Sequence, residues 1–259
     1  MTFDKSELIE LKDNLWFERQ KVAGKCVAAV LKSSEEIIAA KPQNLSLKDL
    51  ESNAIKIIKE HGCSATFLGY KNFPSAICVS VNKHVVHGIV TDYILQDGDV
   101  ISVDLGATYE GAIGDAAKTF IYGDPKSQRI VEMLSTCEKA LEIGIGAIKQ
   151  GNRLGAIGNA IHKYCKDKGF GLIDKYGGHG INYNKPHAAP FVSNKSNPNE
   201  GPRFCPGMSL AIEPMLVLNG NTKTNVLNDH WTVEASDIAC HFEHSIFIDK
   251  DFKVHIMTN

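Results

Sequence analysis

The spacing of apolar residues predicts helices in two separate blocks of the chain. Residues 6–40 carry an apolar stripe among Lys and Glu side chains, which is typical of one or two amphipathic helices. A further helix is expected from a cap at Ser46 to Glu60. The second block contains helices over roughly 128–149 and 154–167.

Strands are predicted between and after these blocks. Short apolar runs over 76–81 and around 84–89 have strand character. An alternating run over 100–105, a Gly-rich segment and a second strand over 119–122 predict a hairpin. The chain from residue 177 onward is expected to be mainly strand and loop. The order helices–strands–helices–strands predicts an α+β fold with a largely antiparallel sheet and helices on one face.

Composition restricts the class of protein. The chain has 259 residues, 43% of them hydrophobic, which suits one large domain or two closely packed halves. A net charge of -2 gives no reason to expect a nucleic-acid partner, and no apolar run is long enough to cross a membrane. The seven cysteines are scattered without a C-x-x-C pair, so we expect reduced thiols in a cytoplasmic protein, without a disulfide framework.

Acidic residues occur where strands are expected to be buried. Asp104 interrupts the apolar run of the predicted hairpin, and Asp115 precedes its second strand. Burying two unpaired carboxylates is unfavourable, so a positive group is expected between them. In the second half, Glu213 follows a turn glycine by six residues, as Asp104 does, and Glu243 lies on a later strand. This weak internal repeat suggests two halves, roughly 1–123 and 124–259.

The candidate site residues have the chemistry of a metal centre. Four carboxylates can balance two divalent cations, and without cations they would repel one another and most would be protonated. An imidazole ligand favours Mn, Fe, Co or Zn over Ca. A pair of ions can share a water and lower its pKa toward about 7. The candidates are Asp104, Asp115, His179, Glu213 and Glu243, with His87 and His187 nearby.

Five motifs together resemble one known family. They are SVNKHVVHGI, ISVDLGATYEGAIGDAAKTF, GGHGI, LAIEPM and HFEHSIFI, in that order. The chain resembles the type I methionine aminopeptidases, metallopeptidases of the pita-bread fold, from near residue 22 to its last strands. The resemblance implies one catalytic domain, with a pseudo-two-fold antiparallel sheet and helices on its outer face.

The resemblance also implies a role for each metal ligand. Asp104 would bind one metal and Asp115 would bridge both. His179 and Glu213 would complete the shell of the other metal, and Glu243 would bridge from the last strand. Glu213 would also carry a proton from the bridging hydroxide's parent water to the leaving amine.

Two histidines and an aromatic pocket are implied to contact the substrate. His87 would contact the scissile amide nitrogen, and His187 would stabilise the carbonyl oxygen. Aromatic faces and a soft sulfur suit the thioether side chain of methionine. The implied pocket residues are Phe67, Tyr70, Phe73, Cys78 and Trp231.

The implied activity is removal of the initiator methionine from nascent polypeptides with a small second residue, through a metal-bridging hydroxide. The cofactors would be two divalent ions (Co, Mn, Fe or Zn), and the substrates the N-termini of nascent chains. A monomer is expected, without nucleic-acid substrate or membrane contact, and with transient contact to the ribosome.

Some features leave other interpretations open. The segment 182–190 is one residue longer than usual in the family, and Phe67 stands where a smaller residue is common, so a divergent second copy with shifted specificity is an alternative. A proline-directed relative and a catalytically silent peptide- or ribosome-binding module are two others. The remaining histidines, among them His241 and His244, are expected to be surface or packing groups.

Overall fold

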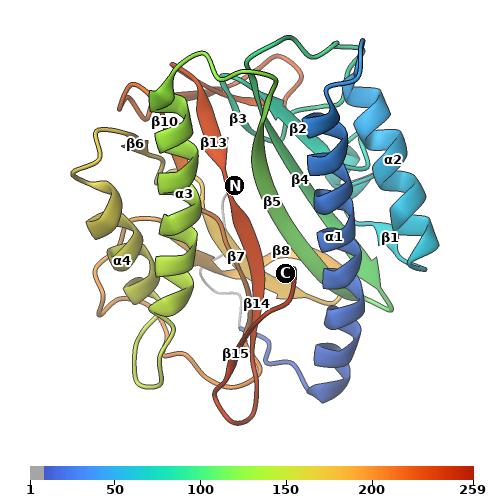
Figure 1. The fold of residues 1–259 in the computed structure, drawn as a ribbon. Coiled ribbons are helices and arrows are strands. Elements are labelled where there is room, and N and C mark those ends of the chain that lie inside the picture. Colours follow the sequence, from blue (N-terminus) through green and yellow to red (C-terminus); the bar gives the residue numbers. More distant parts are fainter. Residues whose placement is uncertain (1–8) are drawn as a thin grey trace.

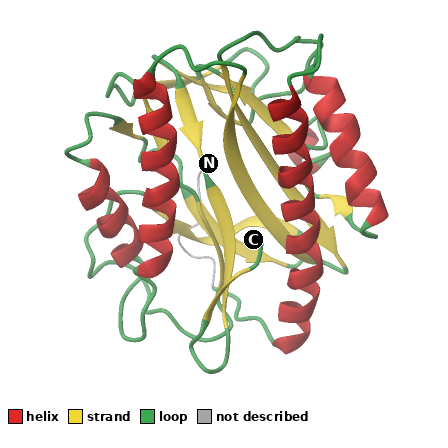
Figure 2. Ribbon diagram, viewed as in Figure 1, coloured by secondary structure: helices red, strands yellow, loops and turns green. Residues whose placement is uncertain are grey.

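The computed structural model describes residues 9–259, so the first residues of the segment 6–40 lie outside the described part. Within the described residues there are four α-helices, and they lie on one side of a curved sheet (Figures 1 and 2). In Figure 1, one helix pair covers the right half of the sheet and the other pair covers the left half. The helices are α1 (Asn14–Ala40), α2 (Leu47–Glu60), α3 (Gln128–Gly146) and α4 (Gly155–Cys165).

Local capping sets the ends of the N-terminal helices. The carboxylate of Asp13 accepts a hydrogen bond from the backbone N–H of Trp16 at 2.8 Å, and α1 then runs unbroken, as one helix rather than two. Ser46 and Asp49 form the reciprocal hydrogen bonds of a capping box at the start of α2. The start expected for α2 is confirmed.

The strands form one large antiparallel sheet and two small ones. The large sheet has the order β1-β4-β5-β14-β9-β7-β8, with β2 on β4 and β15 on β14. The small sheets are β13-β10-β6 and β11-β12-β3. The strands are β1 (Ser64–Ala65), β2 (Cys78–Val81), β3 (His84–Val86), β4 (Asp99–Tyr109), β5 (Ala112–Tyr122), β6 (Gly171–Leu172), β7 (Gly178–Asn182), β8 (Lys185–Val192), β9 (Ser209–Ile212), β10 (Met215–Val217), β11 (Thr224–Val226), β12 (Val233–Ala235), β13 (Ala239–His241), β14 (Glu243–Ile248) and β15 (Val254–Ile256).

The hairpin differs from its prediction in length. β4 and β5 have 11 residues each, so the Gly-rich segment expected to be a connection is itself strand. The turn is reduced to Glu110-Gly111, and Asp115 lies within β5. The glycines of this segment were expected to form a loop. Within β5, Gly114 instead allows helix α1 to approach the sheet closely. β3 ends earlier than expected, at Val86, because His87 has a φ of 59°.

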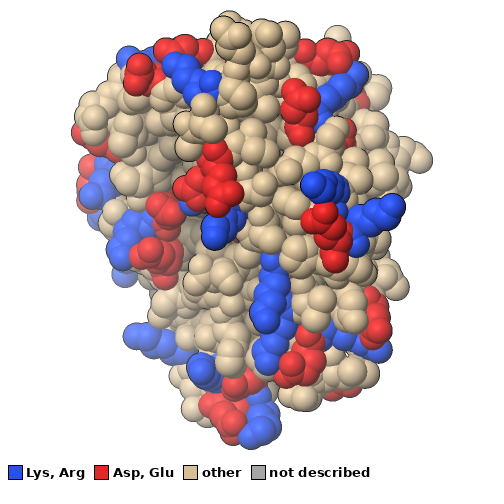
Figure 3. Space-filling model, turned by 45° about the vertical axis from the view of Figure 1, so that its right-hand side comes forward, with Lys and Arg blue, Asp and Glu red and all other residues tan. Residues whose placement is uncertain are grey.

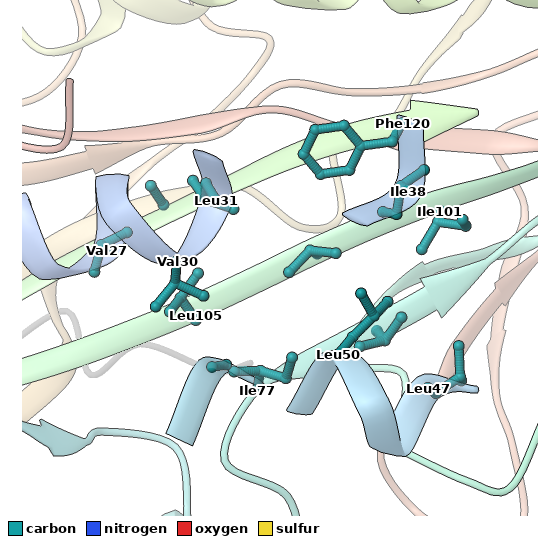
Figure 4. Close-up of a cluster of buried hydrophobic side chains, with 14 of the residues drawn as sticks. Val27, Val30, Leu31, Ile38, Leu47, Leu50, Ile77, Ile101, Leu105 and Phe120 are labelled. Carbon is teal, nitrogen blue, oxygen red and sulfur yellow. The ribbon is translucent and has the colours of Figure 1, made fainter. Parts of the chain in front are cut away.

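The first half of the core lies between the helices α1 and α2 and the strands β4 and β5. Figure 4 shows side chains from both helices pointing toward the strands. Each fully buried aliphatic side chain contributes about 1.5–3 kcal/mol. The labelled residues are Val27, Val30, Leu31, Ile38, Leu47, Leu50, Ile77, Ile101, Leu105 and Phe120.

Two glycines let α1 pack closely on its neighbours. A Cβ on Gly114 would lie 2.7 Å from the backbone nitrogen of Gly24. A Cβ on Gly24 would lie 1.9 Å from the carbonyl oxygen of Met257. Backbone atoms cannot move aside as a flexible side chain can. The close approach of α1 to β5 therefore requires glycine at 114, and its close approach to the segment after β15 requires glycine at 24.

Gly24→Ala is therefore expected to destabilise the protein. Overpacking of this kind costs about 1–3 kcal/mol, and each kcal/mol corresponds to ~2–4 °C in Tm for a chain of this size. Gly146→Ala is the matched control, because nothing lies within 4 Å of a Cβ at that exposed helix end. It should leave Tm unchanged or raise it, since alanine favours helix. Equal Tm values for the two variants in thermal unfolding would contradict the packing argument.

The face seen in Figure 3 has no large area of one charge. Lys and Arg side chains are interspersed with Asp and Glu across it. Within residues 9–259, no helix is long and apolar enough to span a bilayer.

Candidate metal centre

The strand register brings two of the predicted acids to either side of one small residue. On β4, Asp104 is paired with Ala117 of β5, and on β14, Glu243 is paired with the same Ala117. Directly paired residues of antiparallel strands project to the same face of the sheet. Asp115 is two residues from Ala117 on β5, so it also projects to that face.

Two further residues approach this group from the second half of the chain. The ligand atoms of Asp115, His179 and Glu243 all lie within 4.8 Å of one another. Nε2 of His179 lies 3.6 Å from Oε1 of Glu213, which follows β9 directly. Asp104 and Glu213 line the same cavity as these three residues. All five side chains are buried.

Glycines on both sides of His179 let its strand fit between its neighbours. A Cβ on Gly178 would lie 2.1 Å from the carbonyl oxygen of Ala211, and one on Gly180 would lie 1.9 Å from that of Ala189. Nδ1 of His179 lies 3.1 Å from the carbonyl oxygen of Gly180. A carbonyl only accepts, so Nδ1 carries the proton and Nε2 keeps its lone pair for a metal.

The carboxyl groups lack the partners that buried acids normally have. Among the described residues, Asp104 Oδ1, Asp115 Oδ1 and Glu243 Oε1 are buried without a hydrogen-bond partner. Burial is the main cause that raises the pKa of all three carboxyls, and neighbouring carboxylates raise the pKa of Asp115 and Glu243 further. Burial also acts to raise the pKa of Glu213, but contacts with His241, His179 and His87 outweigh it and lower the pKa. Unpaired carboxylate oxygens and one imidazole are a donor set that fits divalent transition metals.

His87 and His187 lie on the walls of the same cavity. Burial lowers the pKa of His87 to about 4 and that of His187 well below its usual value, so both are neutral at pH 7. The ring of His187 lies 4.5 Å from that of His179, centroid to centroid. His87 adopts a left-handed backbone conformation after β3, which a non-glycine residue rarely does outside functional or turn positions.

The predicted pocket residues gather beside the acids. Phe67, Phe73 and Cys78 form a buried cluster against which Trp231 packs, with the Phe73 and Trp231 rings 5.1 Å apart. The Tyr70 ring lies 5.4 Å from His187. All five line the cavity that contains the acids. Further residues that the sequence did not point to line this cavity as well: Val86, Lys175, Tyr176, Phe191 and Met215.

His241, which was expected to be a surface or packing group, does not lie on the surface. Its side chain is buried, and its Nε2 lies 3.3 Å from Oε2 of Glu213 and 3.9 Å from Oε2 of Glu243. The usable signal was spacing, because residues two apart in an extended chain share a face.

A comparison with protein families identifies the chain as a metallopeptidase. The model of metallopeptidase family M24 matches residues 18–250, which is most of the chain. The chain belongs to this family. Members of this family are metallopeptidases, so the expected hydrolase and its use of divalent metal are confirmed.

Individual relatives agree with the resemblance found in the motifs. A methionine aminopeptidase from Mycoplasma capricolum subsp. capricolum is 37% identical over 246 residues, covering 94% of this chain and 96% of that protein. The crystal structure of methionine aminopeptidase from Thermotoga maritima has a TM-score of 0.90 and 35% identity, and the match covers 97% of this chain and all of the other. The resemblance to the methionine aminopeptidases and the pita-bread fold are confirmed.

A proline-directed member of the fold is more distant. The X-Pro aminopeptidase structure from Thermotoga maritima has a TM-score of 0.72 at 20% identity, and the match covers 96% of this chain but 62% of that one. At this identity the similarity concerns the fold alone.

Proposed function

We propose that this M24 enzyme removes the N-terminal methionine from nascent polypeptides, preferring a small second residue. The observation that carries the proposal is one cavity in which unpaired buried carboxyls adjoin an aromatic pocket with a cysteine. Polar donors at one end suit a free amine and a peptide bond, and the apolar end suits a thioether side chain. The high identity to methionine aminopeptidases over nearly the whole chain supports the same choice.

We propose that Asp104, Asp115, His179, Glu213 and Glu243 hold two divalent ions. The mutual proximity of three of them and the unpaired oxygens of the acids support this assignment. Ions bound there would acidify a water and polarise the scissile carbonyl. The donor set admits Co, Mn, Fe and Zn, among which cellular supply selects.

Glu213 is the proposed proton carrier. Its pKa is lowered, whereas that of the other three carboxyls is raised, so it is the carboxylate best prepared to accept a proton at neutral pH. It would take the proton of the attacking water and return it to the leaving amine. The acids around it would bind the free α-amine of the substrate, which restricts cleavage to the first residue.

His87 and His187 are proposed to orient the scissile bond. Both are neutral, so each can donate one N–H without adding charge to the site. Nδ1 of His187 is buried without a hydrogen-bond partner in the described chain, which leaves it free for a substrate oxygen. Phe67, Tyr70, Phe73, Cys78 and Trp231 would enclose the methionine side chain.

The domain organisation, the oligomeric state and the location of the protein are also proposals. One catalytic domain of two halves, roughly 1–123 and 124–259, is supported by acids that come from both halves. A monomer, a cytoplasmic location and transient contact with the ribosome stay predictions.

The proposal is tested with a panel of metals and peptides. Purified protein reconstituted with Mn, Co, Fe or Zn should release methionine from Met-Ala-Ser and much less from Met-Leu-Ser. It should release nothing from Leu-Ala-Ser. Cleavage of Xaa-Pro peptides instead would favour the proline-directed alternative. A folded protein that binds metal but cleaves no peptide would favour the silent binding module.

A further inference from the structure

A buried histidine beside the predicted ligands has no role in the reaction as described above. His241, at the end of β13, is 1% exposed, and neither of its ring nitrogens has a hydrogen-bond partner among residues 9–259. Buried polar atoms are nearly always paired, and an unpaired one costs stability. The position of His241 is therefore better explained by the site than by packing.

The fold holds the backbone of His241 firmly in place. The hydroxyl of Thr119 accepts the His241 backbone N–H at 2.9 Å and donates to its carbonyl oxygen at 2.7 Å. Since that proton is used, the hydroxyl of Ser102, 2.8 Å away, must donate to Thr119. β13 also pairs with β10, where His241 lies opposite Met215, two residues after Glu213.

The two carboxylate oxygens of Glu213 have different neighbours. Oε1 lies 3.6 Å from Nε2 of His179, and Oε2 lies 3.3 Å from Nε2 of His241. Ligands about 2.1 Å from one ion are separated by about 3–3.5 Å, so both distances fit neighbouring groups at a metal site. Since His179 is the proposed ligand, Oε1, the oxygen nearer to it, is the one suited to share its ion. Oε2 remains for the proton, and His241 is the side chain that contacts it.

His241 differs from the proposed ligands in its position. It is not among the three residues whose ligand atoms lie within 4.8 Å of one another, and unlike the five proposed ligands it does not line the cavity. The ring of His241 instead faces the carboxylates of Glu213 and Glu243, with the shorter distance to Glu213. A small rotation of either side chain would complete a hydrogen bond at Oε2.

We propose that His241 is a positioning residue that donates Nε2–H to Oε2 of Glu213. The hydrogen bond would hold the carboxylate with Oε1 toward His179, where it could bind an ion, and would keep Oε2 in a fixed position to accept and return a proton. The expected effect on kcat rests on the proposed function, whereas the expected effect on metal affinity does not. Partners that orient a ligand in this way are typically worth about 10–100-fold in metal affinity or activity.

Two variants of similar size separate donation from packing. His241→Gln keeps an N–H donor, whereas His241→Leu fills the space without one. His241→Leu is expected to lower kcat for Met-Ala-Ser by about 10–100-fold with little change in KM, because the carboxylate that carries the proton loses its orientation. Calorimetric titration of the metal-free protein with Mn or Co should show about tenfold weaker binding of the first ion. His241→Gln should retain most of the kcat and most of the metal affinity of the unchanged protein.

His244→Leu is the matched control. His244 is three residues further along, and its Nδ1 lies 2.9 Å from the Thr258 hydroxyl, away from the acids. This variant should keep the kcat and metal affinity of the unchanged protein. If His241→Leu also keeps both, the positioning role is wrong. If His241→Gln loses one equivalent of bound metal, His241 is a ligand instead. If the unchanged protein releases no methionine, the proposed function fails while the calorimetry still decides the role of His241.

Discussion

Asp115→Asn is expected to lower methionine release by about 10³-fold or more while raising the thermal stability of the metal-free protein. The amide is a poor substitute for a bridging carboxylate, so the hydroxide would no longer form at neutral pH. Stability should rise because Asp115 is buried beside other carboxyls, and burial and those charges raise its pKa. Each pKa unit corresponds to about 1.4 kcal/mol, so a gain of at least ~2–4 °C in Tm is expected at pH 8.

Asp99→Asn is the matched control for this result. Asp99 is a buried acid on the same hairpin, but its carboxylate accepts hydrogen bonds from Asn82, Tyr93 and the backbone N–H of Gln96. Replacing an acceptor oxygen by an NH₂ group sets donor against donor, which costs about 1–3 kcal/mol. Asp99→Asn should therefore lower Tm and leave kcat nearly unchanged. An Asp115→Asn variant that is active, or that loses stability as Asp99→Asn does, would contradict the account of the metal centre.

Divalent metal is expected to raise Tm by more at pH 8 than at pH 6.5. In the folded, metal-free protein the pKa values of Asp115 and Glu243 are well above their ordinary values, because both are buried among other acids. The folded state then keeps protons that the unfolded chain has lost, so stability falls as pH rises toward the folded pKa. The slope is about 1.4 kcal/mol per pH unit for each such carboxyl. Bound metal takes the place of these protons, so the metal-loaded protein should not lose stability as pH rises.

The histidines set the lower limit of the pH range, 6.5 to 8, in which the stability of the metal-free protein should fall as pH rises. Burial lowers the pKa of His87 to about 4 and lowers that of His179 and His187 as well. The unfolded chain binds protons at these positions below about pH 6.5, so their contribution to stability is lost as pH falls. Below pH 6.5, a fall in pH therefore lowers stability through the histidines and raises it through the acids. Above pH 6.5, the pH dependence of stability comes from the acids alone.

Thermal unfolding with a chelator and with Mn or Co, at intervals from pH 6.5 to 8, measures this effect. Tm should decline with pH in the chelator and much less with the metal. Asp115→Asn should reduce the decline in the chelator, because it removes one of the titrating groups. A metal-free Tm that is constant or rises across the window would show that the acids are not held close together in the folded protein.

Helix ends were predictable because their causes are local. The capping box of Ser46 and Asp49 and the cap at Asp13 involve residues three positions apart, so the chain need not fold further for them to form. The Gly-rich part of the hairpin was not predictable in this way. Gly114 is strand because α1, some 90 residues earlier in the chain, packs directly on it.

The candidate site also combines features that depend on sequence neighbours with features that depend on distant segments. The apolar context of Asp104 and the GGHGI segment around His179 are visible in the sequence, and the motifs identify the family. Whether these groups meet depends on register between distant strands, as when Asp104 and Glu243 are both paired with Ala117. His241 was missed because its contact with Glu213 forms across such a register.

The sequence by itself determined the helices, the apolar strands with their acids and the family, because capping, periodicity and motif order depend on neighbours along the chain. Only the tertiary structure decided which carboxyls share a cavity, how burial and neighbouring groups shift the pKa of each, and that His241 lies beside Glu213 and Glu243. The physical reason is that desolvation and charge–charge repulsion depend on distances in space. These distances are set by packing between segments as far apart as β4 and β14.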